Sequence, residues 1–314
     1  MLNDPSRPRR ARWRGAPVGL LQVSAAGVLW GTGGLANQIV RAHTPMSVAT
    51  VSAWRMGIAA VVLVATVLVG RHLPALRAAL RARPGKAAFV GSCTAAYQAL
   101  YFWAVVEAGV TVATVVSLGL APLLLTLWES RQGRPTGRRL LVLAAALTGL
   151  ALTSASAHAG GTGPRPGLGV LLAGLSGTSY AIATQVGRPL AESTPPLILT
   201  TMTTTVGAVV LAPLAVVVGG PCLPTDGTAA LVLLYLGVMT MALAYALLYA
   251  ALRTTSPSSA VIATLLEPVT AAIVAAIVLG ERVGALGVLG IVLVLIAVAG
   301  LGERVATPPE DEPA

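Results

Sequence analysis

A carboxylate and a proline stand next to each other inside an apolar stretch of the chain. Glu267 and Pro268 lie in a run from about Ala260 to Gly280 that holds no other charge, and Arg55 lies inside a second such run. An ionisable side chain at membrane depth costs at least ~2.5–3.5 kcal/mol on insertion scales, so it faces a cavity or a partner. We therefore predict that Glu267 binds a proton or the amine of a ligand and exchanges Arg55 as its counter-ion. The alternative is a fixed Arg–Glu pair that staples two helices together.

Pro268 has a counterpart earlier in the chain, Pro122, which also interrupts an apolar run. Each proline lacks a backbone N–H and removes one helical hydrogen bond, which weakens the helix locally. A bend with a freed carbonyl would give a cavity a polar, deformable wall, and irregular backbone is tolerated in a membrane only where it is buried or lines a cavity. Alternatively, the two kinks serve packing alone.

Several aromatic and amide side chains fall in the middle of apolar runs. Tryptophan and tyrosine usually concentrate at the two membrane interfaces, so rings in mid-run are candidates for lining a cavity, where a ring face can bind a cation. Amides at this depth bond either a ligand or a neighbouring helix, and for the rings the alternative is helix packing. Besides Glu267 and Arg55, the predicted pathway residues are Trp30, Trp54, Tyr97, Tyr101, Tyr180, Asn37, Gln98 and Gln185.

The elements that would carry these side chains are long apolar blocks. Of the 314 residues, 55% are hydrophobic and 10% are charged, whereas a soluble domain has about a quarter charged residues. Most blocks approach the ~20 residues that cross ~30 Å of hydrocarbon as a helix. We predict an all-α integral membrane protein with ten transmembrane helices, at about 17–40, 46–70, 87–107, 111–128, 140–158, 168–187, 197–218, 229–250, 258–279 and 285–302.

The charges between the blocks predict the orientation. With ten spans both termini lie on one side, and most of the 21 Lys and Arg residues fall on that side. Cytoplasmic segments carry such an excess. We therefore predict cytoplasmic termini in the cell's inner (cytoplasmic) membrane, with the lipid bilayer rather than nucleic acid as the partner of these charges. The segment 71–86, RHLPALRAALRARPGK, is either a short helix on the inner surface or an ordinary basic loop.

The chain repeats itself weakly at an offset of 146 to 148 residues. Tyr97–Pro122 and Tyr245–Pro268 both read as Tyr-x-x-x-Tyr, a small-residue connection and a helix that reaches a proline. Five helices per repeat is an odd number, so the two halves insert with opposite orientations. Inverted repeats are typical of secondary transporters, whose binding site lies where the halves meet. Further pairs in the same order are Gly31 with Gly177, Thr32 with Thr178, Gln38 with Gln185 and Arg41 with Arg188.

Three stretches carry a resemblance to a known family. WRMGIAA, QALYFWAVVEAGVTVATVVSLGLAP and LLEPVTAAIVAAIVLGERVGALGVLG resemble the EamA-type modules of the drug/metabolite transporter superfamily, and the resemblance covers roughly Pro17 to Gly302. It implies a ten-helix secondary active exporter of small metabolites, amino acids or drugs that works by alternating access, usually driven by a proton or other ion gradient. It also implies that the first four helices of each half surround a central cavity, with the fifth and tenth helices outside.

The two modules depart from each other at two places. The second-helix arginine of the module matches Arg55, but the corresponding region of the second half reads TTMTTT. The second module ends its fourth helix with Gly280-Glu281-Arg282, whereas the first has Arg134 near the position of the glutamate. The residue roles that the resemblance implies are therefore unequal between the halves.

The predicted organisation is two inverted five-helix repeats around a central cavity. The segments are a basic cytoplasmic tail at 1–16, a first repeat at 17–158, an outer linker at 159–167, a second repeat at 168–302 and a cytoplasmic tail at 303–314. The glycines of the last helix, Gly284, Gly287 and Gly290, allow close helix packing within a monomer or in a weak homodimer.

Other classes of function find less support. A membrane-embedded enzyme would need a nucleophile–base or metal constellation, and the sequence holds no HExxH, no GxSxG and no clustered acid pair. A channel or sensory scaffold is the remaining rival, although a pseudo-twofold monomer does not readily supply a ring-like filter. We predict a transporter of a small-molecule substrate, without enzymatic activity, cofactor or metal, in which Cys93 and Cys222 are free thiols.

Overall fold

Helices make up all the regular structure of the part of the chain that can be described. The structure, a computed structural model, describes residues 16–131, 133, 135–157, 164–279 and 284–302. Nearly all of the two predicted tails, most of the linker at 159–167, and the residues Arg134 and Glu281 lie outside these ranges. The helices that form single spans are α2 (Ala16–His43), α3 (Val48–Val69), α5 (Pro84–Ala108), α6 (Val110–Ser130), α7 (Gly137–Ala157), α8 (Pro166–Ser193), α9 (Pro196–Val218) and α14 (Ala285–Gly302).

Two further spans each consist of more than one helical element, and one short helix is not long enough to cross a membrane. The eighth span joins α10 (Gly227–Tyr235), the π-helix η1 (Leu236–Leu243) and α11 (Ala244–Ala251). The ninth joins α12 (Pro257–Ala263) and α13 (Leu266–Leu279). The short helix is α4 (Leu73–Ala82), so a helix, and not a loop, forms within segment 71–86.

The predicted fold class is confirmed. Within the described ranges, nine helical spans are long and apolar enough to cross a bilayer, and Ala285–Leu301 is a shorter apolar helix. Two helices run past their apolar blocks, α2 beyond residue 40 to His43 and α8 beyond residue 187 to Ser193. Hydropathy missed these ends because Arg41 and Arg188 remain helical after the apolar run has finished.

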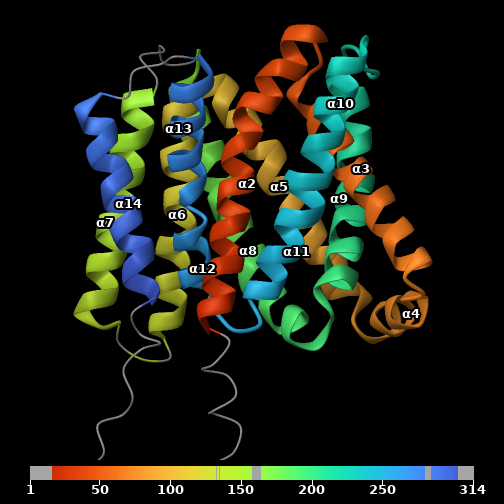
Figure 1. The fold of residues 1–314 in the computed structure, drawn as a ribbon, viewed down its shortest axis with the longest axis horizontal. Coiled ribbons are helices and arrows are strands. Elements are labelled where there is room, and N and C mark those ends of the chain that lie inside the picture. The colour runs from red at the N-terminus through yellow and green to blue at the C-terminus, as the bar shows by residue number, and fades with distance from the viewer. Residues whose placement is uncertain (1–15, 132, 134, 158–163, 280–283, 303–314) are drawn as a thin grey trace, which may run out of the picture.

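Helix packing follows a pseudo-twofold relation between the two halves. In chain order α2, α3, α5, α6 and α7 correspond to α8, α9, α10–α11, α12–α13 and α14. The packing of α5 on α8 is matched by α11 on α2, that of α6 on α8 by α13 on α2, and that of α5 on α9 by η1 on α3. Helix α2 starts at the face where the described chain begins and ends, whereas α8 starts at the opposite face (Figure 1), as inverted repeats require.

Glycines at equivalent positions permit two of these contacts. A Cβ atom on Gly31 of α2 would lie 2.5 Å from the carbonyl oxygen of Glu267, and one on Gly177 of α8 would lie 2.4 Å from that of Ser117 in α6. Small residues promote helix association in membranes because they let two backbones approach closely. Gly31 and Gly177, which are a pair in the sequence repeat, therefore each allow the first helix of one half to pack closely on the fourth helix of the other half.

The helices α7 and α14 pack on each other at one edge of the bundle, away from its centre (Figure 1). Glycines again set the distance, since a Cβ atom on Gly149 would lie 2.7 Å from the carbonyl oxygen of Gly290. Helix α4 lies at the opposite edge. The first four spans of each half are thus left to form the centre.

We predict that Gly31→Ala and Gly177→Ala each destabilise the fold by about 1–3 kcal/mol, the usual cost of overpacking. The added methyl group would meet a backbone oxygen, which can move only if a whole helix moves. Gly34→Ala is the matched control, because a Cβ atom there has no atom within 4 Å. Thermal unfolding in detergent measures the effect, and equal melting temperatures for the three variants would contradict the symmetric contact.

The side on which each loop lies tests the inverted arrangement. Reporter fusions after positions 81 and 135 should report the cytoplasm, because arginines concentrate there, and fusions after positions 162 and 223 should report the outside. A fusion after position 81 that reports the outside would rule out the predicted orientation.

Candidate functional site

The two halves enclose a small cavity between them. Its volume is about 60 Å³, which is below the ~300 Å³ at which ligand pockets usually begin. A larger ligand therefore enters only when the lining elements move apart. The lining residues are Trp30 on α2, Arg55 on α3, Tyr97, Gln98, Tyr101 and Phe102 on α5, Tyr180 on α8, Met241 on η1, Tyr245 on α11 and Glu267 on α13.

A turn of π-helix supplies the contacts of Arg55. The Nη2 atom of Arg55 donates to Thr240 Oγ1 at 3.1 Å and lies 3.6 Å from Met241 Sδ. Trp30 Nε1 donates to the carbonyl oxygen of Thr240 at 2.7 Å. Both contacted residues belong to η1, and π-helical turns are rare and frequent at functional sites. Thr240 thus connects α2 and α3 to the eighth span.

A helix break presents Glu267 to the cavity. Helix α12 ends at Ala263 and α13 begins at Leu266, so Thr264 lies between them. Pro268 has no N–H to offer the carbonyl oxygen of Thr264, and the N–H of Glu267 donates to that oxygen instead, at 2.9 Å. In the first half, by contrast, α6 runs unbroken through Pro122. The break therefore belongs to the second half alone.

Arg55 and Glu267 face the same cavity without pairing. Neither takes part in a salt bridge between described residues, so the fixed staple is absent from this conformation. Arg55 Nε and Gln98 Oε1 are buried without a hydrogen-bond partner, and the Gln98 residue is only 5% exposed. Because buried polar groups in folded proteins nearly always have a partner, these atoms are open to a ligand or to water.

Aromatic rings form most of the remaining wall. Tyr97 and Tyr180 stack with centroids 4.9 Å apart, and Trp30 meets Tyr245 nearly edge-on at 5.2 Å. The hydroxyl of Tyr180 lies 3.4 Å from Thr264 Oγ1 at the helix break. Rings of this kind offer apolar faces that also attract cations. The cavity thus combines one cation, one carboxylate and a stacking surface.

Three residues that were predicted to line the pathway lie outside the cavity. Trp54 Nε1 donates to the carbonyl oxygen of Cys222 at 2.6 Å. It points away from the side of Arg55 because neighbouring residues on a helix differ by about 100° in direction. Asn37 and Gln185 each have a buried side-chain oxygen without a partner, but neither lines the cavity.

The structure adds lining residues that sequence reasoning did not select. Tyr245 carried a usable signal, because it is the repeat counterpart of the selected Tyr97. Phe102 directly follows Tyr101 and was not selected in addition to it. Met241 is one apolar residue in an apolar block and carries no signal of its own. The role of Thr240 depends on the π-helical turn, which the sequence does not indicate.

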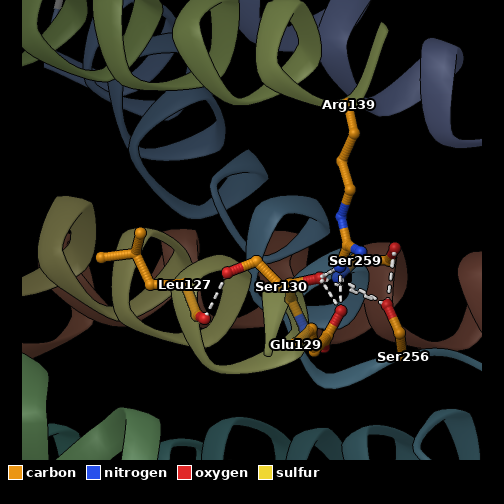
Figure 2. A network of polar contacts seen from close by, with 7 residues as sticks. Leu127, Glu129, Ser130, Arg139, Ser256 and Ser259 are labelled. Atoms are coloured by element: carbon orange, nitrogen blue, oxygen red, sulfur yellow. Dashed lines mark hydrogen bonds and ion pairs between the residues drawn. The ribbon is translucent and has the colours of Figure 1, made fainter. Parts of the chain in front are cut away.

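A carboxylate ties three helices together at the face that carries the chain ends. Glu129, at the end of α6, accepts hydrogen bonds from the N–H of Ser258 at 3.0 Å and from its hydroxyl at 2.9 Å. Arg139, near the start of α7, contacts both Glu129 and Ser258. Figure 2 shows Glu129 and Arg139 converging beside the serines that open α12. Since α6 and α12 belong to different halves, this network holds the halves together on that side of the cavity.

An ion pair and a hydrogen bond join elements at the opposite face. Arg165 donates to both carboxylate oxygens of Glu107, at 2.9 and 2.6 Å, which raises the pKa of Arg165. His43 Nδ1 lies 2.8 Å from Asp226 Oδ2 and so joins the end of α2 to the start of α10. The pKa of Asp226 is lowered, first by the N–H of Ala229 and further by His43. The Asp226 carboxylate, which caps the start of α10, is therefore charged at neutral pH. Its capping interaction is lost as the pH falls through the lowered pKa of Asp226.

A larger hollow, of about 590 Å³, lies in the wall of the bundle between α3, α9 and α10. Its lining is almost wholly apolar, with Trp54 and Cys222 among the residues that border it. A ligand site needs a few convergent polar groups, and within the described residues these gather in the smaller cavity. We therefore assign the candidate site to the cavity between the halves.

Comparison with known proteins identifies the family. Residues 17–155 and residues 167–302 each match the EamA-like transporter family. The chain belongs to this family. It is thereby placed in the drug/metabolite transporter superfamily, and the resemblance noted in the sequence is confirmed.

Two further proteins are similar to this EamA-like transporter. The uncharacterized transporter YwfM of Bacillus subtilis (strain 168) is 30% identical to it over 210 residues, which are 65% of this chain and 68% of the relative. A crystal structure of a protein with 20% sequence identity superposes with a TM-score of 0.76, covering 93% of this chain and 99% of the other, and shows the shared fold. The EamA-like transporter is thus a multi-pass membrane protein that transports small molecules.

We predict that Thr240→Val lowers the transport rate by roughly tenfold, because an unbonded buried group costs about 1–3 kcal/mol and Arg55 would lose its hydroxyl partner. Thr240→Ser keeps the hydroxyl and should retain transport. Thr184→Val is the matched control, since Thr184 is equally buried and its hydroxyl bonds only its own helix. Transport rates per folded protein give the comparison, and a normal Thr240→Val variant would remove Thr240 from the site.

Proposed function

We propose that this EamA-like transporter is a secondary active exporter of small amine-bearing solutes across the cytoplasmic membrane, working by alternating access. The observation that carries the proposal is the presence of two opposite charges, Arg55 and Glu267, that face one cavity without pairing. A solute with both an amine and an anionic group, such as an amino acid, would complement both charges. Such a ligand would remove the desolvation cost that each unpaired charge bears alone.

The neighbouring groups suggest how the solute is oriented. Arg55 holds its Nη2 on Thr240, which leaves Nε for an acceptor on the ligand. Gln98 offers a free carbonyl oxygen to a donor such as an ammonium or a hydroxyl. The stacked pair of Tyr97 and Tyr180 provides a surface for an apolar or aromatic portion of the solute.

Alternating access is supported by the ties at the two faces. The cavity of about 60 Å³ is too small for a metabolite, so this conformation is neither of the loading states. Opening towards the face with the chain ends requires the contact between Glu129 and Ser258 to break. Opening towards the other face requires the contact between His43 and Asp226, or that between Glu107 and Arg165, to yield. Two inverted halves can exchange these roles.

Glu267 is proposed as the coupling group. In the outward-open state a proton would add to the carboxylate, which neutralises it and releases the amine of the solute to the outside. In the inward-open state the proton would leave to the cytoplasm, and the carboxylate would bind the next amine. The same carboxylate would thus bind the proton and the solute in turn.

The expected effect of Glu267→Gln is the loss of gradient-driven efflux, with exchange that needs a higher solute concentration, because the neutral amide resembles the protonated carboxyl group that releases the amine. The amide keeps the shape and hydrogen bonding of the carboxyl group but does not titrate. Proteoliposomes loaded with a panel of labelled amino acids, amines and cationic drugs measure both activities, with and without an imposed proton gradient.

Glu192→Gln is the matched control for this experiment, because it makes the same chemical change at a carboxylate near a surface-exposed helix end. Gradient-driven transport by Glu267→Gln at the rate of the unmodified protein would refute the coupling role. If no member of the panel moves with the unmodified protein, the proposed substrate class is wrong.

A further inference from the structure

Helix α4 lies against the edge of the bundle, apart from the helices that surround the cavity (Figure 1). Its residues Ala75, Leu76 and Ala79 pack on a buried cluster that includes Val67 of α3 and Met202 of α9. No residue of α4 is fully buried. The second half has no helix at the corresponding place, so the internal repeat does not account for α4.

The segment around α4 concentrates positive charge. Two arginines, Arg77 and Arg81, lie one turn apart on the helix, and three more cations, Arg71, Arg83 and Lys86, flank its ends. All five residues are exposed. Like charges at this spacing repel one another, so the cluster favours a ligand that neutralises it.

The described part of the protein supplies no such neutralisation. Of its five carboxylates, Glu267 lies in the central cavity, and each of the other four contacts a basic side chain outside the α4 segment. Those four pairs are Glu107 with Arg165, Glu129 with Arg139, Glu192 with Arg188, and Asp226 with His43. No salt bridge between described residues involves a cation of the α4 segment, so the segment is open to an anionic ligand.

The helix presents three different sides. At about 100° per residue, Arg77 and Arg81 point roughly opposite to the packed face of Ala75, Leu76 and Ala79. Leu73 and Leu80 lie between these two sides, roughly a quarter turn from the packed face, and Leu80 is 47% exposed. A helix with an apolar flank beside a cationic flank sits at the boundary between acyl chains and headgroups.

We propose that α4 and its flanking cations form a binding site for the headgroup of an anionic phospholipid, on the membrane face that carries the chain ends. The phosphate lies against Arg77 and Arg81, and Leu80 contacts the upper part of the acyl chain. This site is independent of the central cavity and of the proposed transport cycle, because none of its residues lines that cavity.

The test measures lipid bound to the purified full-length protein in detergent by native mass spectrometry. Phosphatidylglycerol is titrated against phosphatidylcholine, at low and at high salt. The double variant Arg77→Gln with Arg81→Gln should bind phosphatidylglycerol roughly 10- to 30-fold more weakly, since each cation near an anionic surface contributes about a factor of five. Phosphatidylcholine binding should not change.

The matched control removes two positive charges elsewhere on the same face, through Arg131→Gln with Arg253→Gln. It should keep phosphatidylglycerol binding near that of the unmodified protein, and an equal loss in both double variants would mean diffuse attraction and overturn the site. Leu80→Ser should also weaken phosphatidylglycerol binding. If Leu80→Ser has no effect and inorganic phosphate displaces the lipid at equal concentration, the ligand is a free anion and the lipid assignment fails. Monodisperse gel filtration of every variant confirms folding.

Discussion

Two unpaired charges inside an apolar bundle are the constraint on which the rest of the structure depends. Arg55 and Glu267 both face the space between the halves, and no described side chain of opposite charge pairs with either. Both charges lie beside irregular backbone of the second half. A π-helical turn holds Arg55 through Thr240, and a helix break places Glu267 in the first turn of α13. Irregular backbone survives at membrane depth where it lines a cavity.

Both irregular elements belong to the second half. The eighth and ninth spans are interrupted, whereas their counterparts α5 and α6 are continuous helices. The first half contributes Arg55 and most of the aromatic wall from regular helices. The two halves thus share a fold and differ in the regularity of their third and fourth helices.

The spans and the two charges could be predicted from the sequence because each depends on composition along the chain. Long apolar blocks predict helices of membrane length, and a lone carboxylate such as Glu267 is conspicuous within one. The orientation of a side chain around its helix is less accessible, since a helix that is apolar on all sides has no visible face. Trp54 was therefore predicted to line the pathway with Arg55, although it lies on another side of α3 and donates a hydrogen bond to the carbonyl oxygen of Cys222. The π-helical turn at Thr240 escaped for a related reason, because η1 has the same composition as a regular helix.

The contact between α7 and α14 has a consequence for the history of the chain. These helices are counterparts in the two halves, and Gly149 meets Gly290 where they touch. The same holds for α3 and α9, which also pack directly on each other. An element that packs on its own counterpart makes an isologous contact, the kind found in twofold dimers. A half-length protein of five helices, inserted in both directions, would form these same interfaces between separate subunits, so gene duplication and fusion would have preserved an existing dimer interface.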